Sequence, residues 1–202
     1  MTIGTKSVLY GAHCFFLHPW FVAWGWWKLY GFPWDPRLWV AFFVHDLGYI
    51  GKPNMDGPEG ELHPMLGAQI MSYLFERPRT RAWGEFTLLH SRYYAKALGL
   101  QPSRLCMADK LAITLTPAWL YLPMVRATGE IHEYRAHAIH RLNGNEAVSP
   151  GERQRILGDE ASWYEGVQAY CGRWAWTHRD GKADTWTSDS RERATLIHGV
   201  WK

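Results

Sequence analysis

Apolar residues recur every three or four positions along most of the chain, which is the period of helices that bury one face. Glycine, proline and small polar residues punctuate this pattern where helices start and stop. We therefore expect an all-α fold. The helices predicted from these signals cover about 7–30, 36 to a stop at 48, 63 onward, 80–97, 103 onward, 117–126, 132–140 and 149–176.

The segments between and after these helices are polar or rich in turn-forming residues. Pro19 either begins a second helix within 7–30 or kinks a single one. The glycine- and proline-rich segment 51–60 predicts a loop. A polar connector is expected over 179–190, and a short tail over 191–202 that could dock on a partner or on a second subunit.

Ionisable residues interrupt the apolar stripes of four predicted helices. The helix that begins at Pro36 is apolar until it reaches His45 and Asp46. A carboxylate in such a place is costly to bury unless a cation, a metal or several donors meet it. The next helices carry His63, His90 and Asp109 within their apolar stripes. One histidine on an apolar face is usually a hydrogen-bonded core residue, but this set consists of the ligands that iron, manganese and zinc accept.

The order of these residues resembles the HD-domain superfamily of metal-dependent phosphohydrolases. The family pattern is an early histidine, an adjacent His-Asp pair, two further histidines and a final aspartate. The residues that flank these positions also resemble the family, and the resemblance covers about 13–115. The matching segments are His45-Asp46-Leu47-Gly48, Leu62-His63-Pro64, Leu88-Leu89-His90 and Ala108-Asp109-Lys110-Leu111.

The resemblance implies a helical bundle with a metal site at its centre, holding two divalent ions of iron, manganese or another transition metal. The early histidine and His45 would bind one ion with Asp109, His63 and His90 would bind the other, and Asp46 would bridge them. Two close ions can hold a phosphoryl oxygen and activate water at neutral pH.

The early histidine is either His13 or His18. Val22, Trp26 and Leu29 continue from His18 at helical spacing, which favours His18 as the ligand. The two histidines are five positions apart and so point to different faces of a helix. We expect the other to be structural.

Residues around the predicted ligands suggest how a phosphate would be held. Many HD phosphodiesterases have lysine directly after His-Asp-x-Gly, where this chain has Tyr49. Either Lys52 takes over the phosphate contact from the loop, or the contact is absent. Arg92 is suited to phosphate and would face the cleft as a catalytic residue beside Asp46. Lys110 is expected to be a solvated or salt-bridged surface lysine.

Composition limits the other possibilities. With 202 residues, 47% of them hydrophobic, the chain can bury one core. We expect an HD-type domain over 1–145, with a C-terminal helix and tail over 146–202 packed on it. The 13 tryptophans are expected mostly in the core. The net charge of +3 fits an anionic small molecule, possibly a nucleotide, while the absence of a basic run argues against nucleic acid as a partner.

Cysteine usage and the first helical region bear on location. Cys14, Cys106 and Cys171 are odd in number and far apart, which is typical of reduced thiols in a cytoplasmic protein. The segment 7–27 contains no Lys, Arg, Asp or Glu, but histidines and Pro19 near its middle argue against a stable membrane span. A homo-oligomer remains open.

Three functions follow from these observations. The first is a metal-dependent phosphohydrolase that acts on a nucleotide or another small phosphoester. The second is a di-iron oxygenase on the same scaffold, acting on a small polar or phosphonate-like substrate, because HD-type oxygenases share this ligand set. The third is a protein that binds a ligand without turning it over.

Overall fold

The computed structural model describes residues 1–76, 82–142, 145 and 147–182. Over these residues the chain folds into α-helices and two short 3-10 helices, without a strand, so the all-α prediction is confirmed. The elements are α1 (Ile3–Tyr10), α2 (His18–Tyr30), α3 (Pro36–Val44), η1 (Leu47–Tyr49), η2 (Gly60–Leu62), α4 (Pro64–Phe75), α5 (Ala82–Leu88), α6 (Arg92–Ala97), α7 (Arg104–Leu115), α8 (Ala118–Thr128), α9 (Glu130–Leu142), α10 (Pro150–Ile156) and α11 (Glu160–His178).

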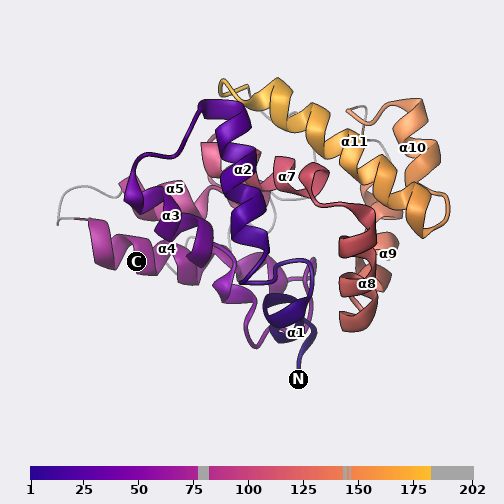
Figure 1. Cartoon of the computed structure of the whole chain (residues 1–202), viewed down its shortest axis with the longest axis horizontal. Helices are drawn as coiled ribbons and strands as arrows, with labels where there is room; N and C mark the ends of the chain where they lie inside the picture. The colour runs from indigo at the N-terminus through magenta and orange to yellow at the C-terminus, as the bar shows by residue number, and fades with distance from the viewer. Residues whose placement is uncertain (77–81, 143–144, 146, 183–202) are drawn as a thin grey trace.

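Helix α7 lies at the centre of the arrangement. It packs against α2 on one side and α11 on another, with α3, α4 and α5 gathered at one end of the molecule and α8, α9 and α10 at the other (Figure 1). None of the described helices is both long enough and apolar enough to cross a membrane.

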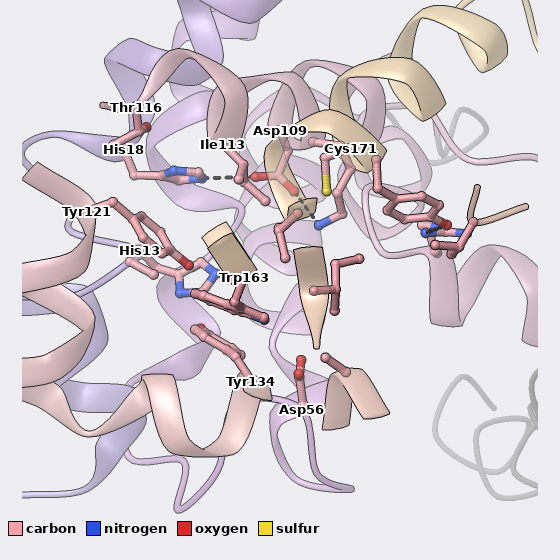
Figure 2. A pocket seen from close by; sticks show the side chains of 18 of the residues that line it. His13, His18, Asp56, Asp109, Ile113, Thr116, Tyr121, Tyr134, Trp163 and Cys171 are labelled. Carbon is pink, nitrogen blue, oxygen red and sulfur yellow. Dashed lines mark hydrogen bonds and ion pairs between the residues drawn. The ribbon is translucent and has the colours of Figure 1, made fainter. Parts of the chain in front are cut away.

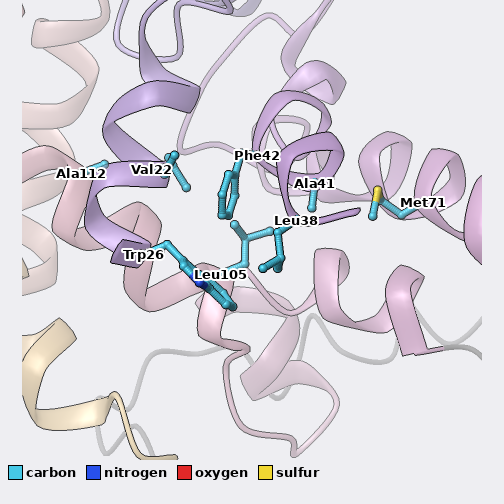
Figure 3. Close-up of a cluster of buried hydrophobic side chains, with 10 residues drawn as sticks. Val22, Trp26, Leu38, Ala41, Phe42, Met71, Leu105 and Ala112 are labelled. Atoms are coloured by element: carbon cyan, nitrogen blue, oxygen red, sulfur yellow. The ribbon is translucent and has the colours of Figure 1, made fainter. Parts of the chain in front are cut away.

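The main core joins α2, α3, α4 and α7. Val22, Phe42 and Leu105 are fully buried there beside Trp26, and Met71 of α4 closes the cluster (Figure 3). A second core, built from α8 to α11, centres on Tyr164. The predicted site lies where the first core ends, so its polar groups are bordered by apolar side chains.

Several predicted helices are divided or end earlier than expected. Pro19 lies in the first turn of a second helix, which was one of the two predicted alternatives. Helix α3 ends at Val44 rather than at Gly48. The single helix predicted over 80–97 is wrong, because Ser91 caps a separate helix by accepting a hydrogen bond from the Tyr94 backbone N–H. In each of these places a local hydrogen bond or proline geometry outweighs the continuing apolar pattern.

The long helix predicted over 149–176 is also wrong. It divides at Gly158 and Asp159, where the Asp159 carboxylate accepts from the Ser162 backbone N–H and starts α11. The connector predicted over 179–190 falls largely outside the described residues, and the tail predicted over 191–202 does so entirely.

Helix α4 buries Gly67, Ala68 and Met71, whereas Leu66 and Leu74 are exposed. Tryptophan is used less for the core than expected. Those that are buried are Trp26, Trp163 and Trp174, and those that are exposed are Trp20, Trp24, Trp27, Trp34, Trp119 and Trp176.

Two glycines let the turn after α3 lie directly on the start of α4. A Cβ atom on Gly48 would collide with the carbonyl oxygen of His63. A Cβ atom on Gly67 would lie 2.6 Å from the carbonyl oxygen of Val44 and 2.9 Å from Cα of His45. Because backbone atoms rather than flexible side chains would be struck, the approach requires residues without a side chain.

Helix α10 is joined to α11 through one buried carboxylate. Ser149 and Glu152 form a capping box, as predicted, and Arg173 of α11 donates to both carboxylate oxygens at 3.0 and 2.7 Å. Burial alone raises the pKa of Glu152, but the hydrogen bonds from Arg173 and Ser149 lower it more, so its net pKa lies below 4.5.

We expect Gly67→Ala to destabilise the protein by about 1–3 kcal/mol, because the added methyl group overpacks a backbone contact. Thermal or urea unfolding measures the loss. Gly151→Ala is the matched control, since nothing lies within 4 Å of a Cβ atom there. Equal stability of the two variants would contradict the close approach of α4 to the turn.

Glu152→Ala is expected to cost about 1–2 kcal/mol, since it removes the cap and the ion pair together. Glu152→Gln retains the capping acceptor and loses only the charge. Because the folded pKa is depressed, the charge stabilises the protein above about pH 4.5 and this contribution is lost as the pH falls through the folded pKa. Urea unfolding at pH 7 and at pH 3.5 should show the difference between wild type and Glu152→Gln shrinking in acid; a constant difference would refute the assignment.

Candidate metal centre

Six ionisable side chains from five separate helical segments meet in the interior. Most come from helix ends: one is the first residue of α2, two follow α3, one precedes α4 and one lies in the turn after α5, while the last is within α7. Each residue is at most 9% exposed. They are His18, His45, Asp46, His63, His90 and Asp109.

Three of the histidines are oriented by the same hydrogen bond. In each, Nδ1 faces the backbone carbonyl oxygen three positions earlier. The pairs are His45 with Phe42 at 2.9 Å, His63 with Gly60 at 2.7 Å and His90 with Thr87 at 2.6 Å. A carbonyl oxygen can only accept, so Nδ1 carries the hydrogen. In the neutral ring, Nε2 then presents a lone pair to the cluster, as metal-binding histidines do.

The first group surrounds one oxygen of Asp46. Oδ2 of Asp46 lies 3.1 Å from Nε2 of His45 and 3.4 Å from Nε2 of His18. Asp109 completes the group, since its Oδ1 lies 3.0 Å from Nε2 of His18 and 3.9 Å from Nε2 of His45. These four residues offer ligand atoms that all lie within 4.8 Å of one another.

The second group surrounds the other oxygen of the same carboxylate. Oδ1 of Asp46 lies 3.6 Å from Nε2 of His63 and 3.4 Å from Nε2 of His90. The two imidazole nitrogens are 3.1 Å apart. Asp46 therefore stands between the groups, with one oxygen toward each.

The chemistry of these donors fits metal ions. Nε2 of His45 and Oδ2 of Asp46 are buried, and within the described part of the chain neither has a hydrogen-bond partner. Nε2 of His63 and Nε2 of His90 face each other, an arrangement that a cation between them would stabilise. Imidazole with carboxylate is the donor set of iron, manganese and zinc sites.

The carboxylates of the cluster are ionised at neutral pH. Burial alone raises the pKa of Asp46, but His45 and His13 lower it well below its ordinary value. Burial also raises the pKa of Asp109, and Lys110 and His18 lower it well below the usual range. The cluster therefore carries two negative charges at the place where cations would bind.

The histidines differ in protonation. Burial and the neighbouring His90 lower the pKa of His63 well below 6.5, so the ring is neutral at pH 7. Burial likewise lowers the pKa of His18, more than Asp109 raises it. Burial alone lowers the pKa of His45, but the carboxylates of Asp46 and Asp109 raise it to about 10. Without a metal ion, His45 is therefore protonated at the nitrogen that a metal ion would occupy.

Of the two early histidines, the structure brings His18 into the cluster. His13 lies beside it, with ring centroids 5.7 Å apart, but its Nδ1 is hydrogen-bonded to Oγ of Ser7 at 2.8 Å. Glu130, which is fully buried, accepts from the Ala12 backbone N–H at 3.0 Å and holds the turn before α2. His13 is therefore placed as the structural histidine.

A cavity of about 250 Å³ adjoins the first group (Figure 2). His18 and Asp109, which are joined by a hydrogen bond, line it together with Tyr121, Trp163 and Tyr134. Asp46, His63 and His90 are not among its lining residues. A molecule in this cavity would thus meet the first group before the second.

Two cations line the cavity, and only one was expected there. Arg92 lines it, with its guanidinium 4.4 Å from the centre of the Trp174 ring, while its catalytic role stays a prediction. Lys110 is salt-bridged to Asp109, with Nζ 2.9 Å from Oδ2, but it lines the cavity instead of the outer surface. Lys52 is not among the lining residues, and its backbone carbonyl accepts from Gly4 of α1.

The other neighbours of the cluster were not predicted. Tyr49 stacks on His63, with ring centroids 4.0 Å apart and planes 9° from parallel. Its position directly after His-Asp-Leu-Gly was the one available signal. Tyr121, Tyr134 and Trp163 come from α8, α9 and α11, and their approach to the cluster depends on how distant helices pack.

Comparison of the chain with protein-family models, with curated proteins and with solved structures finds no significant match. The buried histidine and aspartate cluster is thus compatible with a metal site in a helical protein, while membership of the HD-domain superfamily stays a prediction from the residue pattern.

Proposed function

We propose that the protein is a metal-dependent phosphohydrolase that acts on a small phosphoester. The observation that carries this proposal is the placement of Asp46, whose two oxygens face two separate groups of buried ligands. A cavity with two cationic side chains opens beside one of these groups.

The residues would divide the ions as follows. His18, His45 and Asp109 would hold one, His63 and His90 the other, and Asp46 would contact both. When bound, a pair of divalent ions supplies Lewis acidity and lowers the pKa of water in the site. The carbonyl groups behind His45, His63 and His90 would keep each Nε2 directed inward, so the ligands need no rearrangement on binding.

The cations of the cavity suit an anionic substrate. Nζ of Lys110 lies 2.9 Å from Oδ2 of Asp109, beside the first ligand group, where the ammonium could contact a phosphoryl oxygen of the substrate. Tyr170 receives a hydrogen bond from Arg92 at 3.2 Å, and together with the Trp174 ring it fixes the guanidinium. These side chains would bind and orient the phosphoryl group.

A di-iron oxygenase is the second candidate, because four imidazoles and two carboxylates also suit iron. The two reactions differ in what they consume. Hydrolysis proceeds without oxygen and releases phosphate or a phosphomonoester, whereas oxygenation consumes oxygen and requires iron. A ligand-binding protein would show neither reaction.

We expect the wild-type protein, reconstituted with Mn²⁺ or Fe²⁺ and then desalted, to retain about two ions per chain, as a dinuclear centre requires. Asp46→Ala should retain almost none, because both ions lose a ligand. His63→Ala should retain about one. Elemental analysis measures each.

His132→Ala is the matched control, since His132 is exposed on α9 and should not alter metal content. Full metal content in Asp46→Ala would disprove the shared carboxylate. Release of phosphate from phosphoesters under nitrogen tests the reaction class. If the iron-loaded protein instead takes up oxygen and releases no phosphate, the oxygenase is the correct assignment.

Lys110→Gln is expected to lower kcat/KM for a phosphoester roughly tenfold or more, mainly through KM, because a charged hydrogen bond to the substrate is lost. Metal content should stay unchanged. Lys52→Gln serves as the comparison and should have little effect, since Lys52 lies outside the cavity lining. A large effect of Lys52→Gln, with none from Lys110→Gln, would contradict this role of Lys110 and favour the phosphate contact by Lys52 that was expected from the sequence.

A further inference from the structure

The cavity beside the first ligand group has two unlike ends. One end carries His18, Asp109 and Lys110. The remainder lies between α7, α8, α9, α10 and α11, and we call this part the chamber. Its aliphatic lining consists of Ile113, Ala138, Leu142, Val148, Ile156 and Val167.

Aromatic side chains form a further part of the chamber walls, and the polar residues Asp56, Thr116 and Asn145 are also among the residues that line the cavity. Tyr121 is buried and stacks on Tyr164, with ring centroids 4.3 Å apart and planes 10° from parallel, so its position is fixed. Trp163 is 2% exposed and lines the same space with Tyr134. Rigid aromatic and aliphatic walls favour apolar ligand atoms, because such atoms leave water without losing hydrogen bonds.

The size of the cavity restricts what can enter. Its volume of about 250 Å³ exceeds the roughly 150 Å³ of a cavity that accommodates benzene and falls below the roughly 300–1,000 Å³ of sites for drug-sized ligands. A phosphoryl group together with one ring or one short branched chain matches this volume. A nucleotide, with a sugar and a base, is larger and would present polar edges to aliphatic walls.

We propose that the substrate is a small amphiphilic phosphoester, whose anionic group lies against Lys110 and whose single ring or short apolar chain fills the chamber between α7, α8, α9, α10 and α11. This inference rests on the proposed function and narrows its substrate class. It places specificity on the C-terminal helices α9 and α11, away from the ligand groups that would hold the metal.

The test compares two non-hydrolysable probes, phenylphosphonate and methylphosphonate, by calorimetric titration of the Mn²⁺-loaded protein. Phenylphosphonate should bind roughly tenfold tighter or more, because its ring buries apolar surface that a methyl group lacks. Adenosine monophosphate should bind more weakly than phenylphosphonate, because its base and sugar exceed the chamber.

Ala138→Phe fills the chamber, so this variant should bind phenylphosphonate and methylphosphonate with about equal affinity. Ala136→Phe is the matched control, with the same change two residues away on an exposed position of α9, and should retain the preference. Val167→Ala, which enlarges the chamber, provides a second variant if Ala138→Phe does not fold, and should improve binding of 1-naphthylphosphonate relative to phenylphosphonate.

The outcomes separate this inference from the proposed function. Equal binding of phenylphosphonate and methylphosphonate, or an unchanged preference in a folded Ala138→Phe variant, would overturn the amphiphilic substrate even if the protein hydrolyses phosphoesters. If the preference disappears in Ala138→Phe but the wild-type protein hydrolyses no phosphoester, the chamber is supported as the binding site for the apolar group and the proposed hydrolase activity is overturned.

Discussion

The structure depends on a hydrogen bond repeated three times, from Nδ1 of a histidine to the carbonyl oxygen three positions earlier. His45, His63 and His90 each form it, at the end of α3, at the start of α4 and in the turn after α5. The bond fixes which nitrogen carries the hydrogen and directs the other toward Asp46. The carbonyl groups of Gly60 and Thr87 also accept the backbone N–H of His63 and of His90, so each of these histidines is tied to the same carbonyl through both its backbone and its ring.

Burying this cluster requires compensation from its surroundings. Two carboxylates and four imidazoles leave water together, and His13, His45 and Lys110 lower the pKa values of the carboxylates. The apolar core of α2, α3, α4 and α7 packs against the cluster, and glycines at 48 and 67 allow the backbone segments to touch. A cation at each group would neutralise charge that the protein alone balances only in part.

The sequence predicted the elements whose signals are local. Apolar periodicity located most helices, and the interruption of their stripes identified five residues that the structure brings together, namely His45, Asp46, His63, His90 and Asp109. The sixth, His18, was favoured over His13 only through the family pattern and helical spacing. Helix ends were less predictable, because the caps at Ser91 and Asp159 compete with apolar patterns that continue past them. Lys110 and the chamber walls could not be assigned, since helical spacing relates neighbours on one helix and not side chains from α7, α9 and α11.

The most direct test of the central claim is a crystal structure of the protein loaded with Mn²⁺, with anomalous scattering used to locate the ions. The account predicts two anomalous peaks on opposite sides of the Asp46 carboxylate. One should lie among His18, His45 and Asp109, and the other beside His63 and His90. A single peak away from Asp46, or no peak in crystals grown with excess Mn²⁺, would contradict a centre bridged by this carboxylate.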